Sequence, residues 1–157
     1  MTESISSPPL MLAGRTIVVT GAARGVGRVI AEACGRQGAK LILGDILADE
    51  GEKTAAALRE SGLDARFSPL DLAEPGSIEA FAQEIAGREG AIHGLVNNAA
   101  ITNTGGPSFD ALEIDAWDRV MRVNVRGTWL MTRAMAPLLL AGGTGRIVNL
   151  ASDTALW

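Results

Sequence analysis

Tyrosine is absent from the 157 residues, and the chain holds one cysteine and one histidine. Without a phenol, no reaction carried out by these residues can use tyrosine as its proton donor. Cys34 alone cannot form a disulfide within the chain, which favours a reducing compartment, so we expect a cytoplasmic protein. The only histidine, His93, falls inside a predicted strand and is expected to be structural. No metal site is predicted.

Basic clusters and long apolar runs are also missing. The net charge is −4 and the basic residues are scattered, which argues against nucleic acid or an anionic membrane surface as a partner. The longest apolar segment, residues 129–143, is broken by Arg133 and Pro137, so it falls short of the roughly 20 residues of a membrane helix. The N-terminus carries Glu3 and lacks the basic start of a signal peptide.

The composition suits one compact domain. Hydrophobic residues make up 47% of the chain, enough for a sizeable core. The Ser- and Pro-rich start predicts a flexible arm over residues 1–12, followed by one domain over residues 13–157.

Strand and helix patterns alternate along the domain. Short apolar runs predict five strands, over Arg15–Thr20, Lys40–Asp45, Ala65–Leu70, Ile92–Asn98 and Gly145–Ser152. Helical patterns lie between them, over Gly25–Gln37, Ala48–Glu60, Pro75–Gly90 and Ile114–Leu140. Apolar residues share one side of the first helix, namely Val26, Val29, Ile30 and Ala33, and Ser77 is a possible cap of the third. This alternation predicts an α/β fold with a parallel sheet.

A glycine-rich turn follows the first strand and leads directly into a helix. Gly21, Gly25 and Gly27 have the spacing G-x-x-x-G-x-G. Such a turn lets the backbone approach a pyrophosphate at the N-terminus of the helix, although the spacing alone is equally compatible with a plain connecting turn. Asp45 ends the second strand, where a carboxylate can accept hydrogen bonds from both hydroxyls of an adenosine ribose. A solvated strand-end carboxylate is the alternative.

Five motifs in order resemble those of the short-chain dehydrogenase/reductase family. They are TGAARGVG (20–27), DL (71–72), NNAA (97–100), RVNVRG (122–127) and GRIVNLAS (145–152). The resemblance covers residues 13–157 and implies a Rossmann-like, doubly wound sheet of strand order 3-2-1-4-5. The family usually has glycine where Ala100 stands.

The resemblance also implies the residues that hold the cofactor. Asp71 would bond the adenine amino group with Leu72 beside it. Gly21, Gly25 and Gly27 would form the pyrophosphate turn, and Arg24 and Val26 of the same motif are also expected to bind the cofactor. The backbone around Asn98, Ala99 and Ala100 would line the ribose. Arg24 stands where members that prefer NADP often carry a base, whereas Asp45 stands where members that prefer NAD carry their acid. A carboxylate beside a 2′-phosphate is repelled, so we expect NAD, with NADP as the second choice.

On the catalytic side, the resemblance implies Asn124 and Ser152 as family residues. Asn124 shares a helical stripe with Trp117, Met121, Thr128, Met131 and Met135, and a satisfied buried amide is the structural alternative for it. Ser152 lies just past the fifth strand. The alternative to a catalytic role is that it is an ordinary hydroxyl residue at the end of a strand. The family's Tyr-x-x-x-Lys element would follow about a dozen residues later, beyond Trp157.

We therefore expect a chain truncated after the fifth strand, the cofactor-binding portion of an NAD-dependent oxidoreductase that interconverts an alcohol and a ketone. The alternative is an inactive dinucleotide-binding fragment or regulatory module. The expected partners are a small alcohol or ketone and, at full length, further copies of the protein in a homo-oligomer.

Overall fold

The computed structural model describes residues 10–102 and 109–152. Most of the predicted N-terminal arm and most of the loop after the fourth strand lie outside these ranges. Leu12 lies inside them. Its N–H donates to the Gln37 carbonyl at 2.9 Å, and its side chain packs against the core on one face of the sheet.

One parallel sheet forms the centre of the molecule. Its five strands are β1 (Thr16–Thr20), β2 (Lys40–Asp45), β3 (Ala65–Pro69), β4 (Gly94–Asn97) and β5 (Arg146–Asn149). Their order is β3-β2-β1-β4-β5, which confirms the predicted order, and every pair is parallel. The last residues of the strands lie in register, so that Asp45 pairs with Pro69 and Asn97 with Asn149. All five carboxyl ends therefore meet at one edge.

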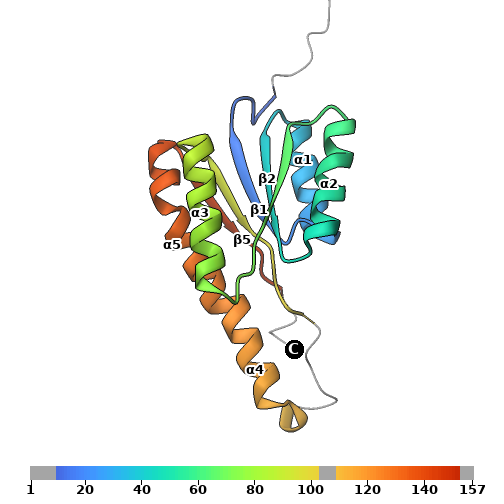
Figure 1. Cartoon of the computed structure of the whole chain (residues 1–157), viewed down its shortest axis with the longest axis vertical. Coiled ribbons are helices and arrows are strands. Elements are labelled where there is room, and N and C mark those ends of the chain that lie inside the picture. Colours follow the sequence, from blue (N-terminus) through green and yellow to red (C-terminus); the bar gives the residue numbers. More distant parts are fainter. Residues whose placement is uncertain (1–9, 103–108, 153–157) are drawn as a thin grey trace, which may run out of the picture.

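Helices cover both faces of this sheet (Figure 1). The helices α1 (Gly25–Arg36) and α2 (Ala48–Glu60) lie on one face, and α3 (Pro75–Glu89) and α5 (Thr128–Ala141) on the other. The short elements η1 (Phe109–Ala111), α4 (Ile114–Val120) and η2 (Met121–Gly127) precede α5.

The strands supply alternate side chains to two cores, because successive residues of a strand point to opposite faces. On β1, Ile17 and Val19 join the core under α1 and α2, whereas Val18 joins the core under α3 and α5. The side chains of β1 are buried on both faces of the sheet. The unbroken β-branched run predicts this for a strand that is covered on both sides.

The face that α1 turns to the sheet differs from the predicted one. Val26 and Val29 are 62% and 64% exposed, and the buried residues of the helix are Gly27, Ala31 and Gly35. A Cβ on Gly35 would lie 2.9 Å from Leu41 Cδ1. The helix lies so close to the sheet that its inner face has room only for small side chains.

The predicted continuous helix over 114–140 contains a change of geometry. Its middle, η2, is π-helical, and α4 and α5 flank it in direct succession. Short π-helical turns inside α-helices are frequent at functional sites. Asn124 lies within this one.

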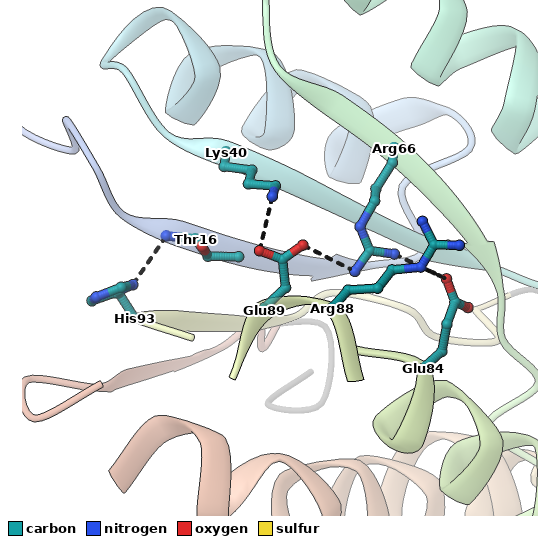
Figure 2. Close-up of polar contacts among 7 residues, drawn as sticks. All are labelled: Thr16, Lys40, Arg66, Glu84, Arg88, Glu89 and His93. Carbon is teal, nitrogen blue, oxygen red and sulfur yellow. Dashed lines mark hydrogen bonds and ion pairs between the residues drawn. The ribbon is translucent and has the colours of Figure 1, made fainter. Parts of the chain in front are cut away.

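An ionic network joins α3 to the amino-terminal halves of β2 and β3 (Figure 2). The Glu89 carboxylate, only 7% exposed, pairs with Lys40 at 2.9 Å and with Arg66 at 3.5 Å. Arg66 pairs also with Glu84, which in turn accepts a hydrogen bond from Ser68. The network fixes the carboxyl-terminal half of α3 against the sheet. His93 lies nearby and has the expected structural role, because its Nδ1 accepts the Thr16 N–H at 3.0 Å.

The substitution Glu89→Gln tests how much this network contributes to the stability of the fold. We expect it to lower the free energy of unfolding by about 1–3 kcal/mol, since it leaves Lys40 and the largely buried Arg66 without their shared carboxylate. Glu52→Gln is the matched control, because the Glu52–Arg59 pair is exposed and is worth less than about 1 kcal/mol. Denaturant unfolding of both variants measures the difference, and equal losses would contradict the assignment.

Candidate dinucleotide site

A cleft of about 360 Å³ opens at the carboxyl ends of the strands. Eight of the predicted site residues line it, namely Gly21, Arg24, Asp45, Asp71, Leu72, Asn98, Ala99 and Ala100. Sequence reasoning missed five further lining residues, Ile46, Leu47, Leu70, Ile101 and Val123. Ile46, Leu70 and Ile101 each adjoin a predicted cofactor residue in the sequence, and Leu47 follows Ile46, so adjacency was the available signal. Val123 comes from η2 and lies within the RVNVRG motif next to Asn124, so the motif was the available signal for it.

The glycine turn is a backbone cradle that side chains would fill. Gly21 has a φ of +65°, and a Cβ on it would lie 2.7 Å from Ala99 Cα. A Cβ on Gly27 would lie 2.2 Å from the Gly21 carbonyl oxygen and 2.5 Å from Asn98 Nδ2. Gly25 has a φ of +59° with open space around its Cα. A turn with no room for a side chain at Gly21 and Gly27, and with open space at Gly25, suits the close approach of a pyrophosphate.

The start of α1 adds a favourable field for an anion. The helix begins at Gly25, so the N–H groups of its first turn, including that of Val26, have no acceptor further back in the helix. No acidic residue lies in that turn. These N–H groups and the positive end of the helix dipole favour a bound phosphate.

Asp45 is held in place by backbone donors. Its Oδ2 accepts the Ala23 N–H at 2.9 Å and its Oδ1 accepts the Leu47 N–H at 3.0 Å. The residue is 9% exposed and lines the cleft. A carboxylate has about four lone-pair sites, so two remain for donors such as a pair of ribose hydroxyls.

Arg24 is the only basic residue among those that line the cleft. Its side chain is 74% exposed and lies 4.0 Å from the Glu50 carboxylate, a solvent-screened pair. Its guanidinium is therefore weakly held, in contrast to the fixed carboxylate of Asp45.

Asp71 follows β3 in a tight turn. Its Oδ1 accepts the Ala73 N–H at 2.8 Å, and its own N–H donates to Ser77 Oγ at 2.9 Å. Ser77 therefore does not cap α3, as its position had suggested. The residue at the N-cap is Glu74, without a side-chain cap bond, and Pro75 opens the helix. Leu72 is buried beside the turn, and its carbonyl lies against Gly127.

Hydrogen bonds tie the end of β4 to the end of β1. Thr20 Oγ1 accepts the N–H groups of Asn98 and Ala99, both at 3.1 Å. Asn98 Nδ2 donates to the carbonyls of Thr20 and Gly21 at 2.9 and 3.1 Å. The segment from Asn98 to Ala100 is thus fixed beside the glycine turn.

The two predicted catalytic residues lie on elements next to this segment. Asn124 in η2 clasps the backbone of Ile101, accepting its N–H at 2.8 Å and donating to its carbonyl at 2.9 Å. Both polar atoms of the amide are therefore engaged. Ser152 follows β5 and is exposed. Ser152 follows β5, which pairs with β4, and Asn124 bonds Ile101, which follows β4, so both residues lie near the edge where the strands end.

A metal site and a membrane-spanning helix would each place requirements on the described residues of the chain. Within residues 10–102 and 109–152, no group of His, Cys, Asp and Glu could hold a metal ion. No helix there is long and apolar enough to cross a membrane. Burial raises the pKa of the Cys34 thiol above its ordinary value, so the group stays a neutral thiol at neutral pH.

A doubly wound parallel sheet with a glycine cradle at its switch point defines a Rossmann-type nucleotide-binding domain. The family model for short chain dehydrogenases matches residues 15–156, and the chain belongs to this family of NAD(P)-binding oxidoreductases.

Several known proteins are similar to this chain in sequence or in structure. A sorbitol dehydrogenase of Cereibacter sphaeroides is 39% identical over 150 residues, 92% of this chain and 55% of that protein. An NADPH-dependent aldehyde reductase 2 of Arabidopsis thaliana is 36% identical over 164 residues, 96% of this chain and 60% of that protein. The structure of a gluconate 5-dehydrogenase from Burkholderia cenocepacia, in complex with NADP and tartrate, superposes with a TM-score of 0.86 at 33% identity and covers 95% of this chain and 58% of its own. The chain thus spans little more than half of the relatives that it matches.

Gly27→Ala tests the cradle. The added methyl would collide with the Gly21 carbonyl, so we expect a loss of about 1–3 kcal/mol in the free energy of unfolding and weaker dinucleotide binding. Gly87→Ala is the control, because Gly87 is exposed within α3 with open space around it, and alanine there gains about 0.5–1 kcal/mol. A Gly27→Ala protein as stable as the parent would show that the turn is not tightly packed.

Proposed function

We propose that this chain is the cofactor-binding portion of an NAD-dependent oxidoreductase that interconverts an alcohol and a ketone by hydride transfer. The observation that carries the proposal is the fixed Asp45 carboxylate, which lines the cleft and keeps lone pairs for two hydroxyl donors. Two relatives with names of alcohol-oxidising enzymes, the sorbitol and gluconate 5-dehydrogenases, support the reaction class.

NADP is the competing cofactor. The gluconate 5-dehydrogenase was solved with NADP, and the Arabidopsis relative is named as NADPH-dependent. In this chain Arg24 is the residue that could favour the 2′-phosphate. We prefer NAD because Asp45 is buried and held by two N–H groups, so it cannot turn away from a phosphate, whereas Arg24 is exposed and free to swing into solvent.

The bound nicotinamide would supply the hydride acceptor or donor. Around it, we propose that the N–H groups of the glycine turn bind the pyrophosphate, Asp45 orients the ribose and Asp71 accepts a hydrogen bond from the adenine amino group. The Ser152 hydroxyl would hold the substrate oxygen. Asn124 would act in the proton path by fixing the Ile101 segment beside the nicotinamide.

The proton itself needs a group that these residues do not supply. No tyrosine occurs in the 157 residues, and we propose that the acid–base pair of the whole protein lies outside them. The same lack supports the second candidate function, an inactive dinucleotide-binding module. In that case only the whole protein would act on the small alcohol or ketone. We propose that the whole protein is cytoplasmic.

Self-association of the whole protein is proposed from one helical face. Exposed apolar side chains recur there at helical spacing, namely Ile114, Trp117, Met121, Val125 and Trp129. They follow one another along α4, η2 and the start of α5, a stretch that extends beyond the sheet in Figure 1. An exposed stripe with two tryptophans is typical of a protein–protein contact.

Cofactor choice is tested by calorimetric titration with NAD and NADP. We expect tighter binding of NAD, and Asp45→Ala should shift the preference towards NADP, because the repulsion of the 2′-phosphate is removed. Arg24→Ala serves as the control and should weaken NADP more than NAD. Tighter binding of NADP by the parent chain would mean that Arg24 decides the choice.

Turnover is tested on the purified chain. Positioned acid–base groups contribute about 10²–10⁴-fold to a rate, and without a phenol the 157 residues should give no NADH from secondary alcohols. A version extended through a Tyr-x-x-x-Lys element and the remaining family length should oxidise one, and Ser152→Ala should reduce that activity strongly. NADH formation by the 157 residues, free of host dehydrogenases, would refute the proposed role of the missing pair.

A further inference from the structure

Ser77 makes a hydrogen bond that its own helix does not need. It lies in the first turn of α3, yet its Oγ accepts the N–H of Asp71, six residues earlier, at 2.9 Å. Ser77 therefore connects α3 to the turn that brings Asp71 into the cleft.

That turn holds Asp71 from two sides. The N–H of Asp71 is fixed by Ser77, and its Oδ1 accepts the Ala73 N–H at 2.8 Å. The first bond sets where the backbone of Asp71 lies, and the second sets how its carboxylate is turned. Together they fix a hydrogen-bond acceptor at the wall of the cleft.

The helix that carries Ser77 is itself firmly attached to the sheet. Ile78, Phe81 and Ile85 are at least 98% buried between α3 and the strands. At the far end of α3, Glu84 and Glu89 join the ionic network of Figure 2. The Ser77 hydroxyl is thus a fixed point relative to the sheet, against which the loop after β3 is set.

We propose that Ser77 is a positioning residue for recognition of the nucleotide base. By accepting the Asp71 N–H, it places the Asp71 carboxylate where it accepts a hydrogen bond from the exocyclic amino group of adenine. This role rests on the proposed function, since it requires a bound adenine dinucleotide.

A loss of base recognition and a general loss of stability have different effects on dinucleotide binding. Replacing the exocyclic amino group by a carbonyl removes the donor at that position and sets a carbonyl oxygen there instead, which the Asp71 carboxylate repels. Loss of the Ser77 hydroxyl should therefore weaken the adenine dinucleotide more than the hypoxanthine dinucleotide. A variant that merely loosens the fold should weaken both by the same factor.

The experiment is calorimetric titration of the 157-residue chain with NAD and with nicotinamide hypoxanthine dinucleotide. The parent should bind NAD about 3- to 10-fold more tightly, the value of one hydrogen bond. In Ser77→Ala this ratio should fall to within about 2-fold of unity. Ser77→Thr keeps the hydroxyl and should keep the ratio. Ser61→Ala is the matched control, because Ser61 Oγ donates to the Ala57 carbonyl at the end of α2, away from the cleft.

The outcomes distinguish the two proposals. A parent chain that binds neither dinucleotide overturns the proposed function and the role of Ser77 with it. A parent that prefers NAD, with a Ser77→Ala variant of unchanged ratio, leaves the proposed function standing and overturns only the role of Ser77. If Ser77→Ala does not fold, Ser77→Cys decides, because it is close in size and its sulfur is a weaker acceptor. An unchanged ratio in that variant also overturns the role.

Discussion

The contact on which the site depends is the one between Gly27 and the carbonyl of Gly21. The backbone of α1 lies so close to the end of β1 there that no side chain fits between them. This approach brings the start of α1, the glycine turn and Asn98 at the end of β4 into one small volume. The unpaired N–H groups at the start of α1 therefore lie close to the carboxyl ends of the strands, because bulkier residues would push the helix away from the sheet. Thr20 also holds the ends of β1 and β4 together, because its hydroxyl accepts two N–H groups from the segment that follows β4.

The two carboxylates of the cleft are placed by the backbone rather than by cations. Asp45 and Asp71 each accept a hydrogen bond from the main-chain N–H two residues further along the chain, Leu47 and Ala73 respectively, and Asp45 also accepts the Ala23 N–H from the glycine turn. Main-chain donors move less than long side chains, and they leave part of each carboxylate's accepting capacity unused. The site thus offers fixed acceptors to hydroxyl and amino donors and a positive helix end to phosphates. A nucleotide presents these groups.

The sheet order and most element bounds could be predicted because β-branched runs, glycine stops and five family motifs agree along the chain. The inner face of α1 could not, since the hydrophobic pattern points to Val26 and Val29 while close packing selects Gly27, Ala31 and Gly35. The π-helical turn could not either, because it accompanies a tertiary contact, the pair of hydrogen bonds between Asn124 and Ile101, that the local sequence does not encode. Asp45 and Asp71 were found from position and resemblance, whereas the partner of Ser77 depends on a fold-back of the chain that no local pattern records.

The π-helical turn also sets the phase of the helix that contains it. Each residue of an α-helix advances the next side chain by about 100° around the axis. Met131 and Met135 after the turn are fully buried under the sheet, and Asn124 within it faces Ile101. If the same residues wound as a regular α-helix, one end would rotate against the other by roughly that angle. The helix would then give up either its hydrogen bonds to Ile101 or its place in the core, and the wider π turn lets one continuous helix keep both.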